Sequence, residues 1–226
     1  MSKKDQNRMF TWLFAAVIIF GSFLWIMFNG GNSSDPISDD GSVNIPELSE
    51  NEWVKGNAES DIVLIEYSDF QCPACKSALP TIEGAVSEFS NHIKFVYRQF
   101  PLRSIHPNAQ ITAQASEAAG LQGKFWEMHD ILFENQSNWK DLNSSEIDDV
   151  LVGYAGEIGI NSEQFADDLR SSDVEKAVNE DYDGADRAKL RGTPTLILNG
   201  KIANPSASES LRDIIRAEIE SAETGE

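Results

Sequence analysis

The chain has 226 residues, and its 37 acidic and 18 basic side chains give a formal net charge of −19 at pH 7. So acidic a surface repels phosphate backbones, which argues against nucleic-acid binding. A hydrophobic fraction of 41% supplies enough apolar material for a core and excludes disorder along the whole chain. Two cysteines are too few for a disulfide-stapled mini-protein or, alone, for a four-ligand zinc site.

The first 28 residues have the pattern of a membrane anchor. Phe10 to Phe28 is a run of 19 residues without a charged side chain. At about 1.5 Å per residue, it can cross a hydrocarbon core of roughly 30 Å. Three basic residues and one acidic residue precede it, so the positive-inside rule leaves residues 1–9 in the cytoplasm. We therefore expect a transmembrane signal anchor at 10–28, with the rest of the chain outside the cytoplasm.

A cleaved signal peptide is the alternative to this anchor. Its apolar region is normally about 7–15 residues long and is followed by a small-x-small cleavage site. The run in this chain is longer and ends in Trp25-Ile26-Met27-Phe28. A lipid-anchored protein is excluded because no cysteine precedes Cys72. The pattern favours the uncleaved anchor.

Residues 29–51 separate the predicted anchor from the predicted domain. They are rich in Gly, Ser, Asp and Asn, include two prolines, and contain neither Lys nor Arg. This composition predicts a flexible acidic linker. From Trp53 onward the sequence is typical of a globular protein, and we place the domain at 52–226.

The domain contains three predicted strands. Ile62–Ile65 and Ile93–Tyr97 are short β-branched or aromatic runs bounded by polar residues. Thr195–Leu198 is the third strand, and Asn199-Gly200 predicts a two-residue hairpin turn into Lys201-Ile202.

Roughly 90 residues between the second and third strands have a helical pattern. The order strand, helix, strand, helical block, hairpin and helix predicts an α/β domain with a large helical insertion at about 103–190. Helix starts are expected where a Ser or Asn is followed three residues later by Glu or Gln. The predicted helices include Gln110–Leu121, Lys124–Phe133 and one around Ile147–Tyr154, and the capping pairs are Asn161 with Gln164, Ser172 with Glu175 and, at the final helix, Ser206 with Glu209.

The segment Cys72-Pro73-Ala74-Cys75 follows the first predicted strand and opens a helix. Unsatisfied backbone N–H groups and the helix dipole at this position stabilise a thiolate on Cys72. Pro73 suits the first helical turn because its missing N–H has no intrahelical partner there. We expect Cys72 to be exposed at the start of the helix and Cys75 to be shielded by its first turn, where Cys75 can close or open a disulfide with Cys72. The motif predicts redox chemistry carried by the cysteine pair, with no other cofactor.

Two structural thiols, or half of a metal site, are the alternatives for this pair. In an oxidising compartment, two neighbouring cysteines are not expected to remain as unreactive free thiols. A metal site needs further ligands, and the three histidines, His92, His106 and His129, show no metal-ligand spacing. We therefore expect no metal, and we expect His106 and His129 to be packing or capping residues.

From about Trp53 to its end, the chain resembles the DsbA-like branch of the thioredoxin superfamily, and in particular membrane-anchored bacterial thiol–disulfide oxidoreductases. Several segments besides the cysteine motif carry this resemblance. They are Glu66, six residues before Cys72; Pro80, eight residues after it; Gly192-Thr193-Pro194-Thr195 before the last strand; and His106-Pro107-Asn108-Ala109 and Gly123 to Asp130 within the helical insertion.

The resemblance implies a thioredoxin fold and a role for each site residue. Cys72 and Cys75 are the catalytic pair, and Glu66 is a buried acid that helps proton transfer. A cis peptide bond joins Thr193 to Pro194, and these two residues together with Pro73 and Ala74 bind the substrate. The implied substrates are exported thiol-containing proteins. The implied electron acceptor is a quinone-linked, DsbB-type membrane oxidase, with the catalytic domain on the extracytoplasmic side of a bacterial cell membrane.

One position departs from the strongly oxidising members of that branch. They typically have His where this chain has Ala74. A protonated His adds a charge that stabilises the thiolate, and Ala does not. We therefore expect a disulfide donor of moderate oxidising strength. A disulfide reductase or isomerase of the same fold, and a tethered binding or metallochaperone module, remain the alternatives.

Overall fold

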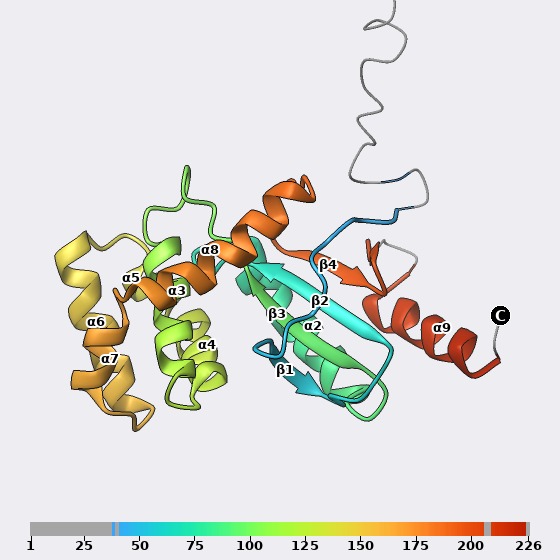
Figure 1. The fold of residues 1–226 in the computed structure, drawn as a ribbon, viewed down its shortest axis with the longest axis horizontal. Helices are drawn as coiled ribbons and strands as arrows, with labels where there is room; N and C mark the ends of the chain where they lie inside the picture. Colours follow the sequence, from blue (N-terminus) through green and yellow to red (C-terminus); the bar gives the residue numbers. More distant parts are fainter. Residues whose placement is uncertain (1–37, 39–40, 206–208, 225–226) are drawn as a thin grey trace, which may run out of the picture. The chain divides into compact units, whose positions relative to one another are not determined.

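The structure is a computed structural model that describes residue 38 and residues 41–205 and 209–224 (Figure 1). Residues 36–226 form one compact unit. The predicted anchor at 10–28 and the first part of the predicted linker lie outside the described residues. Within the described part of the chain, no helix has both the length and the apolar character needed to cross a membrane.

A five-stranded mixed sheet lies at the centre of the domain, in the order β1-β3-β2-β4-β5 (Figure 1). Its central strand β2 is parallel to β3 and antiparallel to β4. The strands are β1 (Trp53–Gly56), β2 (Val63–Ser68), β3 (Lys94–Gln99), β4 (Thr195–Leu198) and β5 (Lys201–Ile202).

The three predicted strands and the hairpin are confirmed. Asn199 and Gly200 both have positive φ, 46° and 79°, as a two-residue hairpin turn requires. Strand β1 was not predicted from the sequence. It has only four residues and pairs antiparallel with β3 at one edge of the sheet. So short a segment has little periodicity of its own, and its pairing partner lies about 40 residues further along the chain.

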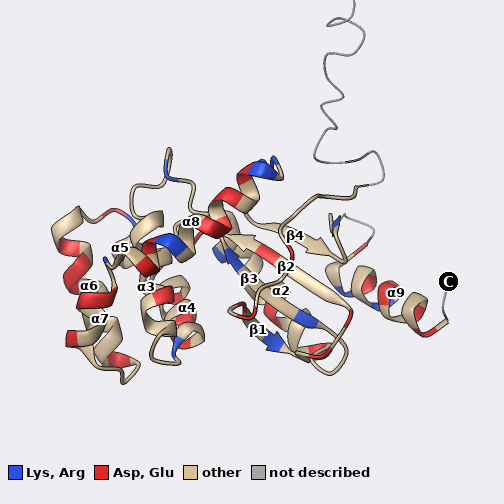
Figure 2. Cartoon of the chain, viewed as in Figure 1, with Lys and Arg blue, Asp and Glu red and all other residues tan. Residues whose placement is uncertain are grey.

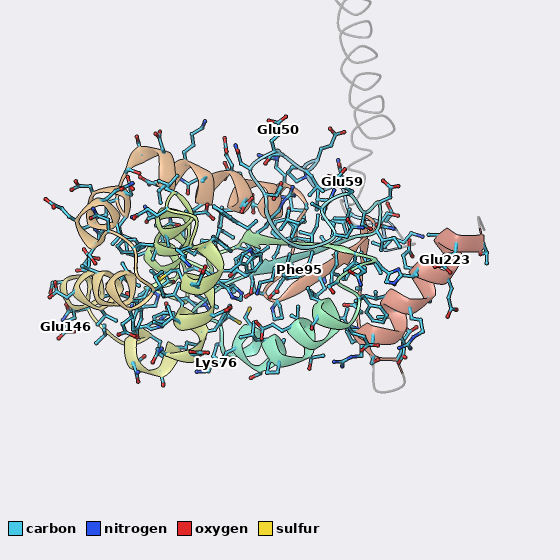
Figure 3. All side chains as sticks on the ribbon, turned by 90° about the horizontal axis from the view of Figure 1, so that it is seen from below. Glu50, Glu59, Lys76, Phe95, Glu146 and Glu223 are labelled. Carbon is cyan, nitrogen blue, oxygen red and sulfur yellow. The ribbon has the colours of Figure 1, made fainter. Side chains whose placement is uncertain are left out.

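Two helices cover one face of the sheet, namely α2 (Pro73–Glu88) and α9 (Leu211–Thr224). Leu64 of β2 and Phe95 of β3 are buried against them. Side chains alternate along a strand, so Glu66 lies on the same face as Leu64. Ile65 and Tyr67 point to the other face, where they contact the C-terminal part of a long helix of the insertion. Figure 3 shows Phe95 in the interior of the domain.

The helical insertion lies between β3 and β4, as predicted. Its core is built around the fully buried Trp139, Met128 and Leu132. Asp and Glu positions are spread over its helices and over α9 (Figure 2). The helices of the insertion are α3 (Ala109–Gly120), α4 (Phe125–Glu134), α5 (Gln136–Trp139), α6 (Ser144–Glu157), α7 (Ser162–Asp168) and α8 (Ser172–Arg187).

Of the predicted helix starts, one is confirmed and one is shifted by a residue in the structure. Asn161 caps α7 as expected, because its side chain accepts hydrogen bonds from the backbone of Glu163 and Gln164. Helix α8 is capped by Ser171 and not by Ser172, because the Ser171 hydroxyl accepts from the backbone N–H of Val174.

The final helix begins at Leu211, after a pair of reciprocal hydrogen bonds between Ser210 and Asp213. Ser206, the predicted start, lies outside the described residues. In a stretch containing several serines, the motif alone does not say which hydroxyl has the backbone geometry of a cap.

The predicted boundary at residue 52 is too late. Val43 is only 7% exposed, and Ser42 forms a β-bridge with Lys201. The Arg98 guanidinium donates hydrogen bonds to the carbonyls of Pro46 and Glu47 at 3.0 and 3.1 Å. Residues 41–51, expected to be linker, are therefore bound to the domain through backbone contacts that composition does not reveal.

Candidate active site

Cys72 is the residue that precedes helix α2, where the loop from β2 ends. Its backbone N–H donates to the carbonyl of Asp69 at 3.0 Å, and its own carbonyl accepts from Lys76 at 3.2 Å. Pro73 is the first residue of the helix, as predicted. The Asp69 carboxylate fixes the loop by accepting from the backbone N–H groups of Gln71 and Leu102 at 2.8 and 2.9 Å. The loop therefore holds Cys72 at the positive end of the helix dipole.

Both cysteines are free thiols in the structure, and Cys75 lies one helical turn beyond Cys72. Cys75 is 1% exposed and Cys72 is 6% exposed. The expectation that Cys72 is an exposed residue is therefore wrong, although it is the more open of the two. Pro73 and Ala74 between them are exposed. The Cys72 sulfur lies against the neighbouring loop at the Thr193 carbonyl.

The surroundings of the two sulfurs shift their pKa values in opposite directions. A hydrogen bond from the Cys75 thiol is the main cause that lowers the pKa of Cys72, and burial opposes it. The Thr193 side chain and the backbone N–H groups of Cys75 and Ala74 lower the Cys72 pKa further. Burial, followed by the hydrogen bond to Cys72, raises the pKa of Cys75. Cys72 is therefore the thiolate of the pair, which makes it the nucleophile when the pair is reduced.

The predicted cis peptide bond between Thr193 and Pro194 is confirmed. The Cys72 thiol lies 3.4 Å from the carbonyl oxygen of Thr193. A cavity of about 490 Å³ adjoins this loop, lined by Thr193 to Leu196, by Ala78 of helix α2 and by residues of the β5 end. The structure thus brings Cys72 next to the Thr193–Pro194 loop, which lies more than 120 residues further along the sequence.

Glu66 lies on β2 and is 2% exposed, so its expected burial is confirmed. Burial is the main cause that raises the pKa of Glu66 to about 7, helped by the nearby charge of Glu83 and opposed by Ser68 and Lys55. The carboxyl lines a cavity of about 370 Å³ together with Lys55, Glu83 and His129. Glu66 can therefore hold or release a proton near neutral pH, in a space that borders the helix carrying Cys75.

The helical insertion supports the cysteine loop through residues that the sequence analysis missed. The amide of Gln136 on α5 donates to the carbonyls of Phe70 at 2.7 Å and Cys72 at 3.1 Å. Gln71 donates to the carbonyl of Lys140 at 2.6 Å. Nothing in the local sequence marks Gln136, because its partners lie more than 60 residues earlier in the chain.

The two histidines within the helical insertion and the loop before it have the roles expected of them. His106 Nδ1 lies 2.6 Å from Asp69 Oδ2, so it supports the carboxylate that fixes the cysteine loop. His129 is 2% exposed within an aromatic cluster, and its Nδ1 lies 2.7 Å from Asp130 Oδ1. Both are packed and hydrogen-bonded side chains.

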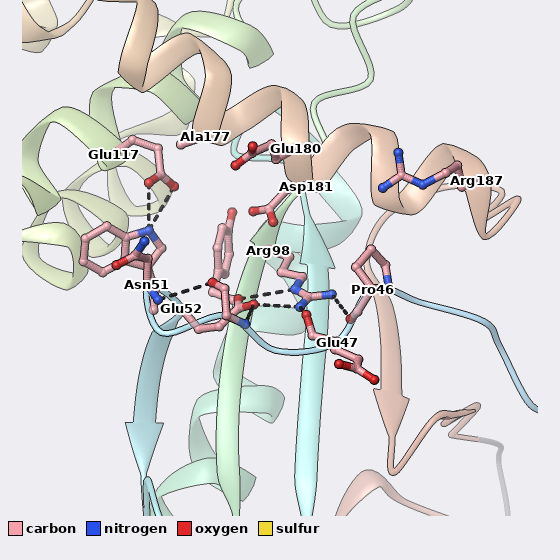
Figure 4. A pocket seen from close by; sticks show the side chains of 13 residues that line it. Pro46, Glu47, Asn51, Glu52, Arg98, Glu117, Ala177, Glu180, Asp181 and Arg187 are labelled. Atoms are coloured by element: carbon pink, nitrogen blue, oxygen red, sulfur yellow. Dashed lines mark hydrogen bonds and ion pairs between the residues drawn. The ribbon is translucent and has the colours of Figure 1, made fainter.

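A second group of buried carboxylates lies where the insertion meets the sheet, beside a cavity of about 300 Å³ (Figure 4). Glu117 accepts hydrogen bonds from the Trp53 indole at 2.9 and 3.0 Å and from the Gln99 side chain at 2.9 Å. Asp181 accepts from the Gln99 backbone N–H at 2.9 Å. Burial is the main cause that raises the pKa of Glu117 to about 7 and that of Asp181 to about 8. The sequence analysis did not find this group.

A family model described as thioredoxin matches residues 48–217, which is three quarters of the chain. Two curated relatives are named Na(+)/H(+) antiporter NhaA 1. The protein from Salinispora arenicola is 37% identical over 157 residues, which is 70% of this chain and 23% of the relative. The protein from Mycolicibacterium vanbaalenii is 36% identical over 204 residues, which is 88% of this chain and 31% of the relative. This chain thus spans about a third or less of these relatives' length.

Solved structures of similar fold include BdbD from Bacillus subtilis, with a TM-score of 0.66 and 23% identity over 81% of this chain and 98% of that one. A thioredoxin-like oxidoreductase from Silicibacter pomeroyi has a TM-score of 0.61 and 22% identity, over 79% of this chain and 95% of that chain. The thiol–disulfide exchange protein alpha-DsbA2 from Wolbachia pipientis also has a TM-score of 0.61, with 18% identity over 77% of this chain and 88% of that chain. With a family match over most of its length, the chain belongs to the thioredoxin family and has the fold of DsbA-like proteins.

Proposed function

We propose that this chain is a thiol–disulfide oxidoreductase that donates the Cys72–Cys75 disulfide to thiol-containing exported proteins. The observation that carries the proposal is the placement of Cys72 at the start of α2, facing the Thr193–Pro194 bond. The surroundings of Cys72 lower its pKa. A stabilised thiolate exists only in the reduced form, so this lowered pKa favours the reduced form and makes the disulfide oxidising.

The exchange proceeds in two substitutions at sulfur. A substrate thiolate attacks Cys72 Sγ of the oxidised pair, which forms a mixed disulfide and releases Cys75 as a thiolate. Cys75 then takes up a proton, for which we propose the neutral Glu66 carboxyl as the donor. A second substrate thiolate attacks the substrate sulfur of the mixed disulfide and releases Cys72 as a thiolate. The substrate loses two electrons to the cysteine pair and leaves with its disulfide formed.

The substrate is expected to bind as an extended peptide beside the Thr193–Pro194 loop. The cavity next to this loop and the exposed Pro73 and Ala74 support a binding surface there. Reoxidation requires an electron acceptor, for which we propose a quinone-linked, DsbB-type membrane oxidase. An anchor at 10–28 would hold the domain on the extracytoplasmic side of a bacterial cell membrane, next to such a partner.

The deciding experiment is the reduction potential of the Cys72–Cys75 pair in the full chain, equilibrated against glutathione buffers. We expect a value closer to the roughly −120 mV of DsbA than to the roughly −270 mV of thioredoxin. Ala74 in place of His keeps the expected value below that upper limit. A potential near that of thioredoxin would support a reductase and contradict the donor role.

A trapping experiment tests which cysteine meets the substrate. Cys75→Ser removes the thiol that can attack Cys72 and displace the substrate, so the variant should accumulate mixed disulfides with exported thiol proteins. Cys72→Ser is the matched control and should accumulate none. If both variants trapped substrates equally, Cys72 would not be the residue that meets the substrate.

A further inference from the structure

Three potential metal ligands converge beside the cavity that Glu66 lines. Glu83 belongs to α2, whereas His129 and Asp130 belong to α4. One ligand atom can be chosen from each residue so that all three atoms lie within 4.8 Å of one another. Glu83 and His129 also line the cavity of about 370 Å³. Two helices separated by about 40 residues of sequence thus direct one imidazole and two carboxylates to the same point.

The imidazole of His129 is held in place before any ion arrives. Its ring is 2% exposed and makes edge contacts with the rings of Tyr97, Trp126 and Phe133, at centroid distances of 5.1, 5.2 and 5.1 Å. Its Nδ1 lies 2.7 Å from Asp130 Oδ1, so the imidazole and one carboxylate are already adjacent. A ring held by its neighbours loses little freedom on ligation, so its ordering costs little.

A positively charged side chain of the protein, Lys55, already lies near these three ligands. The ammonium of Lys55 lies 4.3 Å from the centre of the Trp126 ring. Its charge reaches Glu66, His129 and Asp130. An ion bound by the three ligands would therefore compete with Lys55, whose long flexible stem allows the ammonium to move away.

We propose that Glu83, His129 and Asp130 bind a divalent transition-metal ion of the zinc type. An imidazole nitrogen with two carboxylate oxygens is a typical zinc ligand set, whereas calcium and magnesium prefer oxygen ligands alone. Zinc bonds of about 2.0–2.2 Å place ligand atoms roughly 3.4 Å apart. The exposed Glu83 side chain can close the remaining distance by a change of rotamer. The fourth position would face the cavity and hold water. This site does not depend on the function proposed above.

Binding is tested by calorimetric titration of Zn²⁺ into the full chain with the Cys72–Cys75 disulfide formed, so that the two thiols cannot act as ligands. We expect one Zn²⁺ per chain at this site. Glu83→Gln and Asp130→Asn should each weaken binding by about 10-fold or more, because each removes one of three ligands. Lys55→Gln should tighten binding several-fold, because it removes the competing cation.

Glu134→Gln is the matched control, because Glu134 ends the same helix α4 but lies outside the ligand group. It should leave the affinity unchanged. Circular dichroism of each variant confirms that it is folded. Co²⁺ provides a second probe, since its visible spectrum should show nitrogen and oxygen ligation without a thiolate band. The proposal is overturned if the oxidised chain binds no Zn²⁺ at about 1 mM, or if Glu83→Gln and Asp130→Asn bind it as tightly as the original chain does.

Discussion

The cysteine loop and the junction between the insertion and the sheet both bury ionisable groups, but they treat the charged form in opposite ways. Cys72 is only 6% exposed, yet hydrogen bonds lower its pKa and favour the thiolate. At the junction, burial raises the pKa of Glu117 to about 7 and that of Asp181 to about 8, so their charged forms are disfavoured.

The difference comes from the balance between hydrogen bonding and burial at each group. At Cys72, hydrogen bonding, chiefly from the Cys75 thiol, outweighs burial, whereas at Glu117 burial outweighs the hydrogen bonds from Gln99 and Trp53. Asp181 accepts one backbone hydrogen bond, and its neighbours Glu117 and Glu52 carry the same charge. Burial alone therefore does not decide the ionisation of a buried group. Donor geometry makes one region reactive and leaves the other sensitive to pH.

The largest expected effect concerns the two thiols. With the pair reduced, iodoacetamide at pH 7 should modify Cys72 at least about 100-fold faster than Cys75, because only the thiolate reacts and only Cys72 has a lowered pKa. Peptide mapping by mass spectrometry gives both rates in one sample. Equal rates would mean that the donors around Cys72 do not stabilise its thiolate, and the comparison would fail.

The second effect is the pH dependence contributed by Asp181. Its folded pKa of about 8 lies above the usual 3.8, so its contribution to stability is lost as pH rises from about 4 through 8. Asp181→Asn keeps an oxygen for the Gln99 N–H but cannot ionise. Compared with the original chain, the variant should be more stable at pH 8, by roughly 5 kcal/mol at most, and similar in stability at pH 4. Urea unfolding at both pH values measures the difference in free energy of unfolding. An equal difference at pH 4 and pH 8 would contradict the raised pKa of Asp181.

A third test compares the reduced and oxidised chains. The lowered pKa of Cys72 stabilises the reduced fold above the unfolded thiol pKa, and this stability is lost as pH falls through the folded value. At pH 7 the reduced chain should be the more stable by about 1–2 kcal/mol, after allowance for solvent screening at the partly open thiol. The gap should narrow in acid. Thermal melts of both forms at several pH values test it, and a more stable oxidised form at pH 7 would reverse the expected direction of electron flow.

The smallest effect concerns the cap of the helix that carries Asp181. Ser171→Ala removes the hydroxyl that accepts from Val174 and should cost about 1 kcal/mol. Ser172→Ala, one residue further on, is the control and should lower the free energy of unfolding by only a few tenths of that amount. Urea unfolding of the two variants distinguishes the observed cap from the predicted one. If Ser172→Ala were the more damaging, the helix would begin one residue later than the structure shows.

Local patterns were enough for the chemistry of the first region. Cys72 and Cys75 lie in one short motif, and Pro73 and the preceding strand are its immediate neighbours, so the helix start and the nucleophile were predicted together. The burial of Glu66 and the cis bond before Pro194 were implied by the resemblance to DsbA-like proteins. The cysteine motif, by contrast, depends on residues near one another in the chain, where spacing constrains geometry.

The second region could not be predicted in this way. Glu117, Asp181 and Gln99 come from α3, α8 and β3, and their sequences look like ordinary polar positions of helices and a strand. The contacts of Gln136 with the cysteine loop and of Arg98 with residues 46 and 47 likewise join distant segments. The exposure of Cys72 was misjudged for the same reason, because the Thr193 loop that its sulfur lies against is about 120 residues away.

Local backbone preference and short hydrophobic periods were enough to predict the cysteine pair at the start of a helix, the order of β2, α2, β3, β4 and β5 along the chain, and the hairpin turn. Which polar groups are buried, and whether hydrogen bonds outweigh that burial, depended on the tertiary structure. Burial and hydrogen bonding depend on segments that meet only after the chain has folded, and these two quantities set the pKa of Cys72, Glu66 and Asp181.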